Sequence, residues 1–113
     1  MRYLLLLHVD ESGWPKLTPA EQAEGMAAYQ SYSEALGAAG AMVSVGRLAP
    51  SAGALAVRTI GGKPVTMDGP FAETKEQIGG FYLIETPDLD AALDWARRCP
   101  AAEHGSVEVR QLL

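Results

Sequence analysis

The segment from Asp68 to Glu85 constrains this chain most, because a tight turn and a strand follow one another within it. Asp68-Gly69-Pro70 has the composition of a turn, since glycine permits positive φ, proline fixes φ, and aspartate can bond the backbone ahead of it. Gly79-Gly80 then frees the backbone, and the aromatic and branched run 81–84 is typical of a β-strand. The sequence therefore predicts a polar loop that leads directly into a strand.

Apolar patterns and turn residues predict the order of the other elements. Arg2 to Val9 is an almost unbroken apolar run, typical of a strand that is buried on both faces. Thr18-Pro19 followed by Glu21 predicts a helix with threonine as its N-cap, and Gly40 is the expected helix end. Gly61-Gly62 predicts a two-residue hairpin turn. Further strands are predicted at 42–48, 55–59, 64–67 and 107–112, with a second helix between Asp88 and Pro100.

This order is strand, helix, strand, two hairpin strands, strand, helix and strand. Two βαβ halves around an antiparallel sheet form the ferredoxin-like α+β plan βαββαβ, here with an extra hairpin. Both helices are expected on one face of the sheet, so the other face needs a cover. The helix residues expected in the core are Met26, Tyr29, Tyr32 and Leu36 in the first helix and Leu89, Leu93 and Ala96 in the second, with Trp95 at the margin.

Length and charge set the class of protein. The 113 residues suit one domain, 1–113, with a single core. The net charge of −5 argues against nucleic acid as a partner, because affinity for the phosphate backbone depends on Lys and Arg. No run approaches the roughly 20 apolar residues of a membrane span, and Asp10-Glu11 interrupts the first apolar run too early for a signal peptide. A single Cys99 excludes an intrachain disulfide, and a cytoplasmic protein is predicted.

The turn, polar loop and strand of residues 68–85 resemble the signature of the DGPF-domain proteins, a branch of the YCII-related family. The resemblance implies a dimeric α+β barrel, in which a second copy of the chain covers the open sheet face as a homodimer. It also implies a His–Asp pair, whose analogue here is His8 with Asp68. DGPF proteins are often encoded beside alternative sigma factors, which implies an alternative function: a non-catalytic accessory or regulatory module of transcription control.

The polar loop contributes Asp68, Glu73 and Lys75 as candidate site residues. A carboxylate that is held in a tight turn and screened from water can act as a general base. Lys75 could bind an anionic group or lower the pKa of a neighbouring carboxylate. The structural alternative is an Asx-turn at Asp68, with Glu73 and Lys75 in exposed polar contacts. For Asp68 the structural role is favoured.

The predicted strands contribute His8 and Arg47. His8 lies at the end of the first strand, and histidine is the side chain best suited to proton transfer near neutral pH. A hydrogen-bonded structural histidine is the alternative. Arg47 follows valines on its strand and needs a counter-charge if it is buried. It could therefore clamp a carboxylate ligand, or pair with Glu73 or Asp68 as part of the structure.

No metal or cofactor is predicted. His8 and His104 lack a metal-ligand spacing, and Gly61-Gly62 lacks the strand-to-helix context of a phosphate-binding loop. The favoured function is a small-molecule-binding protein or enzyme with a pocket between the sheet and the Asp68–Glu76 loop. Its candidate catalytic residues are His8 and Asp68, and its candidate ligand contacts are Arg47, Glu73 and Lys75.

Overall fold

The computed structural model describes residues 1–69 and 75–113, so the predicted site residue Glu73 lies outside the described part. The main sheet consists of β1 (Arg2–Val9), β2 (Met42–Arg47), β5 (Gln77–Glu85) and β6 (Ser106–Gln111). A separate hairpin consists of β3 (Leu55–Ile60) and β4 (Lys63–Asp68). The helices are α1 (Pro19–Ala38), α2 (Leu89–Arg98) and α3 (Ala101–His104), with short 3₁₀ turns η1 (Trp14–Lys16) and η2 (Ser51–Gly53).

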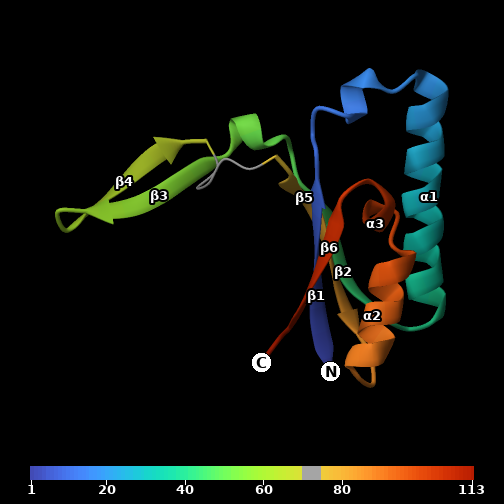
Figure 1. Ribbon diagram of the computed structural model, residues 1–113. Coiled ribbons are helices and arrows are strands. Elements are labelled where there is room, and N and C mark those ends of the chain that lie inside the picture. The colour runs from blue at the N-terminus through green and yellow to red at the C-terminus, as the bar shows by residue number, and fades with distance from the viewer. Residues whose placement is uncertain (70–74) are drawn as a thin grey trace.

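The strand order of the main sheet is β2-β5-β1-β6, and each neighbouring pair is antiparallel. This is the order of a ferredoxin-like α+β domain, so the predicted fold class is confirmed. α1 and α2 lie together on one side of the sheet (Figure 1). The predicted hairpin is also present, but it forms its own two-stranded sheet and extends away on the side opposite the helices (Figure 1).

Both ends of α1 are fixed by the residues that predicted them. The Thr18 side chain accepts a hydrogen bond from the Glu21 amide, and the Glu21 carboxylate accepts one from the Thr18 amide, which completes a capping box. At the other end Gly40 has φ +70°, and the Ala41 amide donates to the Leu36 carbonyl in the pattern of a Schellman motif. No helix of the described residues is both long and apolar enough to cross a membrane.

The core lies between the helices and one face of the sheet. Its members are Tyr3, Leu5 and Leu7 of β1, Tyr82 and Ile84 of β5, Tyr32 and Leu36 of α1, Ala92 and Ala96 of α2, and Ala41, Cys99 and Ala101. Two predicted core residues are exposed: Met26 by 52% and Leu89 by 48%. In α2 the fully buried positions are the small residues Ala92 and Ala96, and the Trp95 ring meets the Tyr32 ring edge to face.

The second face of the sheet has no helix over it. Leu4 and Leu6 of β1 lie opposite Leu83 and Phe81 of β5, and all four side chains are only half-buried. Because side chains alternate along a strand, these residues point away from the buried Tyr3, Leu5 and Leu7. The burial predicted on both faces of β1 is therefore found on one face, and we call the other the open face.

Candidate functional site

His8 lies on the open face near the carboxyl end of β1, beside Glu108 of β6. The Nε2 atom of His8 is 2.9 Å from the Oε1 atom of Glu108. β1 and β6 run antiparallel with His8 opposite Ser106, so Glu108 is the diagonal neighbour of His8 on the same face. The two side chains are 26% and 35% exposed, which leaves the pair reachable from solvent.

Arg110 completes this polar group from the same strand. Its Nε donates to the second carboxylate oxygen of Glu108. The hydrogen bond from Arg110, and then the one from His8, hold the pKa of Glu108 below its usual value. An ionised carboxylate can only accept hydrogen bonds, so Nε2 of His8 is the donor. In the neutral imidazole ring, Nδ1 then carries the lone pair, which is the arrangement of a general base.

The carboxyl end of β1 is held in place by the turn between α3 and β6. A Cβ on Gly105 would stand 1.9 Å from the His8 carbonyl oxygen and 3.0 Å from a carboxylate oxygen of Glu76. Ser106 donates a long hydrogen bond of 3.5 Å to Glu76. Only a residue without a side chain permits this approach, so Gly105 fixes the position of the His8 backbone.

The sequence left Asp10, Asp68 or Arg47 as possible partners of His8, and the family resemblance implied Asp68. The carboxylate that His8 contacts in the structure is that of Glu108. Asp68 is exposed at the end of β4, where it lies opposite Leu55. Lys75 is exposed as well, just before β5. Within the described residues, no hydrogen bond or ion pair joins Asp68 or Lys75 to His8. The predicted pocket is bounded by the Asp68–Glu76 loop, and residues 70–74 of that loop lie outside the described residues.

Arg47 lies on β2, an edge strand of the main sheet, and is exposed rather than buried among valines. Its guanidinium stands 5.6 Å from the centre of the Trp14 ring, and its Nη1 lies 3.7 Å from the sulfur of Met26. The Trp14 ring packs on Gly25 of α1. Arg47 therefore joins the β1–α1 connection to the sheet edge through a cation–π contact.

Glu108 and Arg110 lie in the strand predicted at 107–112, and neither was among the candidate site residues. The signal that identifies them is the combination of strand order and alternation. In a ferredoxin-like sheet the last strand lies beside the first, and alternation places residues 108 and 110 on the face opposite Val107 and Val109. No group of three or more potential metal ligands occurs among residues 1–69 and 75–113.

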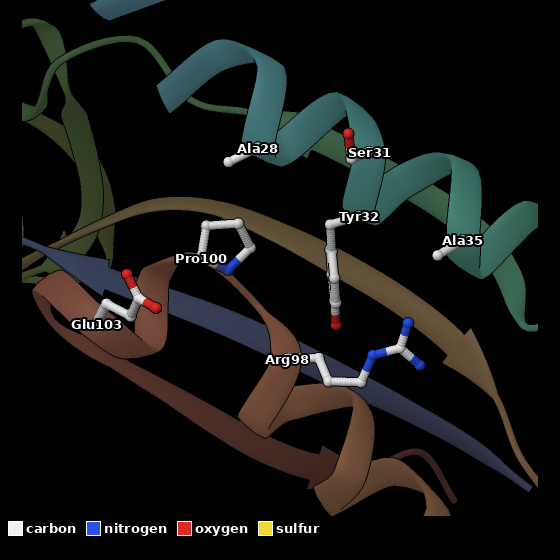
Figure 2. Close-up of a pocket in the computed structure, with 7 residues that line it drawn as sticks. All are labelled: Ala28, Ser31, Tyr32, Ala35, Arg98, Pro100 and Glu103. Carbon is white, nitrogen blue, oxygen red and sulfur yellow. The ribbon is translucent and has the colours of Figure 1, made fainter. Parts of the chain in front are cut away.

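A shallow groove of about 350 Å³ lies on the other side of the sheet, between α1 and the α2–α3 segment (Figure 2). It is lined by Ala28, Ser31, Tyr32, Ala35, Arg98, Pro100 and Glu103. The Tyr32 hydroxyl donates to the Trp95 carbonyl at 2.6 Å, and the Arg98 guanidinium stacks 4.2 Å from the Trp95 ring centre. No predicted site residue lines this groove, so it is not the predicted pocket.

The fold and the site define a class: a ferredoxin-like α+β protein with a histidine–carboxylate pair on the open face of its sheet. The chain matches the YCII-related domain over residues 1–113 and belongs to that family. An uncharacterized protein of Rhizobium meliloti (strain 1021) is 43% identical over 118 residues, which cover 99% of this chain and 92% of that protein.

A solved structure supports the fold. The 5-chloro-2-hydroxyhydroquinone dehydrochlorinase of Burkholderia phenoliruptrix AC1100, in complex with 2,5-dihydroxybenzoquinone, superposes with a TM-score of 0.55. The alignment covers 100% of this chain and 94% of that chain at 17% identity. The fold predicted from the sequence is thus found in a protein of known structure.

Proposed function

We propose that this protein binds a small organic molecule on the open face and uses His8 to transfer a proton. The observation that carries the proposal is the 2.9 Å hydrogen bond between His8 Nε2 and the Glu108 carboxylate. Glu108 orients the imidazole ring through this hydrogen bond, while Nδ1 is left to accept a proton from a bound molecule. Histidine is suited to this role because the charge of an imidazole changes near neutral pH.

The surroundings of His8 favour a compact, largely planar ligand with an ionisable hydroxyl or carboxyl group. Leu6 and Phe81 supply apolar contact area beside the polar pair. The Phe81 ring lies over Gly46, where a Cβ would stand only 2.5 Å from the ring, so the aromatic ring forms part of the floor. The guanidinium of Arg110 adds a positive charge for an anionic substituent. The dehydrochlorinase with a similar fold was solved with 2,5-dihydroxybenzoquinone, a molecule of this kind.

The other predicted contacts remain part of the proposal. β5 begins two residues after Lys75, and its first residue, Gln77, lies opposite Val9. Lys75 therefore precedes β5 at the end of the sheet at which His8 lies, and we keep Asp68, Glu73 and Lys75 as proposed ligand contacts. In the proposal these charged residues contact polar groups at the outer edge of a ligand. The cytoplasmic location also stays a prediction.

We infer further that a second copy of the chain covers the open face. Support comes from the half-buried Leu4, Leu6, Phe81 and Leu83, which form an apolar surface across the two central strands. Burial of this surface would gain roughly 25 cal/mol per Å² of apolar area removed from water. A second copy would also exclude water from His8 and Glu108, which strengthens electrostatic interactions in the site.

The ligand proposal is tested by thermal shift. A panel of phenols, hydroxyquinones and hydroxy acids is screened against the wild type, because a ligand that binds only the folded state raises Tm. For a ligand that shifts Tm, we expect His8→Gln and Glu108→Gln to abolish most of the shift. Any turnover should fall by about 10²–10⁴-fold in His8→Gln, the usual contribution of a general base.

The matched control is His104→Gln, which removes the other histidine, an exposed residue of α3. It should leave both the ligand-induced shift and any turnover unchanged. A shift that is equally large in His8→Gln, Glu108→Gln and the wild type would show that the ligand binds elsewhere.

A further inference from the structure

We propose that the β3–β4 hairpin, residues 55–68, contacts a second copy of this chain, and we call this hairpin the arm. The inference rests on the homodimer proposed above and adds a contact that the open face alone does not supply. In the described part of the chain, β3 and β4 pair only with each other. Leu55 and Val57 are 67% and 69% exposed on one face of the hairpin, and Ile60, Val65 and Met67 are exposed on its other face. An isolated two-stranded hairpin is only marginally stable in water, so these apolar side chains need a partner.

The arm is nevertheless well formed. Gly61 and Gly62 have φ values of +58° and +79°, which form the two-residue turn that matches the twist of a hairpin. Six consecutive residue pairs, from Leu55 with Asp68 to Ile60 with Lys63, are in register. At the base of the arm the Gly69 amide donates to the Ala54 carbonyl at 2.7 Å. A preformed arm loses little conformational entropy when it binds.

The direction of the arm identifies the second copy as its partner. The hairpin leaves the sheet on the side opposite α1 and α2, which is the side of the open face (Figure 1). The chain measures 49 × 40 × 18 Å, and its radius of gyration is 16.0 Å. A compact chain of this length has a radius of gyration of about 13 Å. A copy that covers the open face would fill the angle between sheet and arm and contact both.

Charge favours the same partner. The hairpin 55–68 contains the charged residues Arg58, Lys63 and Asp68 and therefore has a net charge of +1. Because the whole chain has a net charge of −5, the remaining residues together carry −6. A weakly basic arm on an acidic body is complementary to another acidic body of the same kind. Two basic residues are too few for the phosphate backbone of a nucleic acid to be the better partner.

The test is photo-cross-linking from the arm in the full chain. Thr59→Cys places a thiol on β3 near the turn, and a benzophenone maleimide is attached there. Cys99 is only 1% exposed, and burial raises the pKa of its thiol, so the label goes to the new cysteine. Equal amounts of ¹⁴N- and ¹⁵N-labelled protein are mixed, irradiated and digested. We expect cross-linked peptides that combine both isotopes, since these can form only between two copies.

Leu89→Cys provides the matched control, because Leu89 is 48% exposed at the start of α2 on the helix side of the sheet. It should give no mixed-isotope cross-links. A second pair of variants measures affinity by sedimentation. Val57→Glu should raise the dimer dissociation constant by about tenfold or more, because a charge is then buried without a partner. Leu89→Glu should leave that constant unchanged.

The outcomes separate this inference from the proposals on which it rests. If the protein is a dimer but the arm cross-links only within its own copy, the arm is not the interface and the inference fails while the homodimer stands. If the protein is a monomer at micromolar concentration, both the homodimer and the arm fail. Neither result alters the ligand test at His8, which depends on the His8, Glu108 and His104 variants alone.

Discussion

The chemistry of individual residues centres on Glu108, whose carboxylate joins a histidine to an arginine across one face of a sheet. Because Arg110 and His8 both donate to it, Glu108 stays ionised and fixes which imidazole nitrogen carries the proton. This fixed proton position is the feature on which the proposed proton transfer by His8 rests. The pair is partly exposed, so its contribution to stability is small.

This arrangement predicts a pH dependence of stability. The pKa of Glu108 is lower in the folded chain than its ordinary value of 4.5, so folding favours the ionised form. The stabilisation is therefore present above pH 4.5 and is lost as the pH falls through the lower, folded pKa. We expect the difference in unfolding free energy between wild type and Glu108→Gln, measured by urea denaturation, to shrink below pH 4.5. The control Glu103→Gln removes an exposed carboxylate on α3, and a similar pH-dependent difference there would contradict the assignment.

At the scale of elements, local signals predicted what local interactions determine. Thr18 caps the start of α1 and Gly40 follows its end, as predicted, and Gly61-Gly62 forms the predicted hairpin turn. Local sequence is sufficient here because caps and turns depend on a few neighbouring residues. Met26 and Leu89 are exposed although their helical spacing favoured burial, since the side of a helix that is buried depends on what packs against it. The pairing of His8 with Glu108 joins residues 100 positions apart, so it required the strand order as well.

The contact between the end of β1 and the α3–β6 turn gives a prediction about packing. Gly105→Ala would place a Cβ 1.9 Å from the His8 carbonyl, so the backbone must move at a cost of about 1–3 kcal/mol. That movement should also reduce ligand binding at His8. Gly37→Ala is the matched control: it lies within α1, nothing stands within 4 Å of the added methyl group, and alanine favours the helix by about 0.5–1 kcal/mol. Equal and small effects of the two variants on Tm would contradict the proposed role of Gly105.

At the scale of the whole molecule, one chain presents two exposed or half-buried apolar surfaces. The open face carries Leu4, Leu6, Phe81 and Leu83, and the arm carries Leu55 and Val57. A sheet covered by helices on one face only is half of a layered structure, because each apolar face must be buried against another element. The sequence could predict that need from the element order. It could not predict that the hairpin stands apart from the sheet, since its strand pattern fits a fifth and sixth strand of the sheet equally well.

The last prediction concerns association through the open face. Leu83 lies on a central strand and is half-buried there, so Leu83→Glu places a charge that water can solvate in a monomer but that a second copy would bury. We expect the wild type to sediment as a dimer, with a Tm that rises with protein concentration, because association stabilises the folded state by mass action. Leu83→Glu should sediment as a monomer, with a Tm that does not depend on concentration. Val45→Glu is the control, because Val45 is 50% exposed on the outer strand β2, opposite the buried Tyr82 on the helix side. Dissociation by both variants alike would show that added charge, and not the open face, disrupts the dimer.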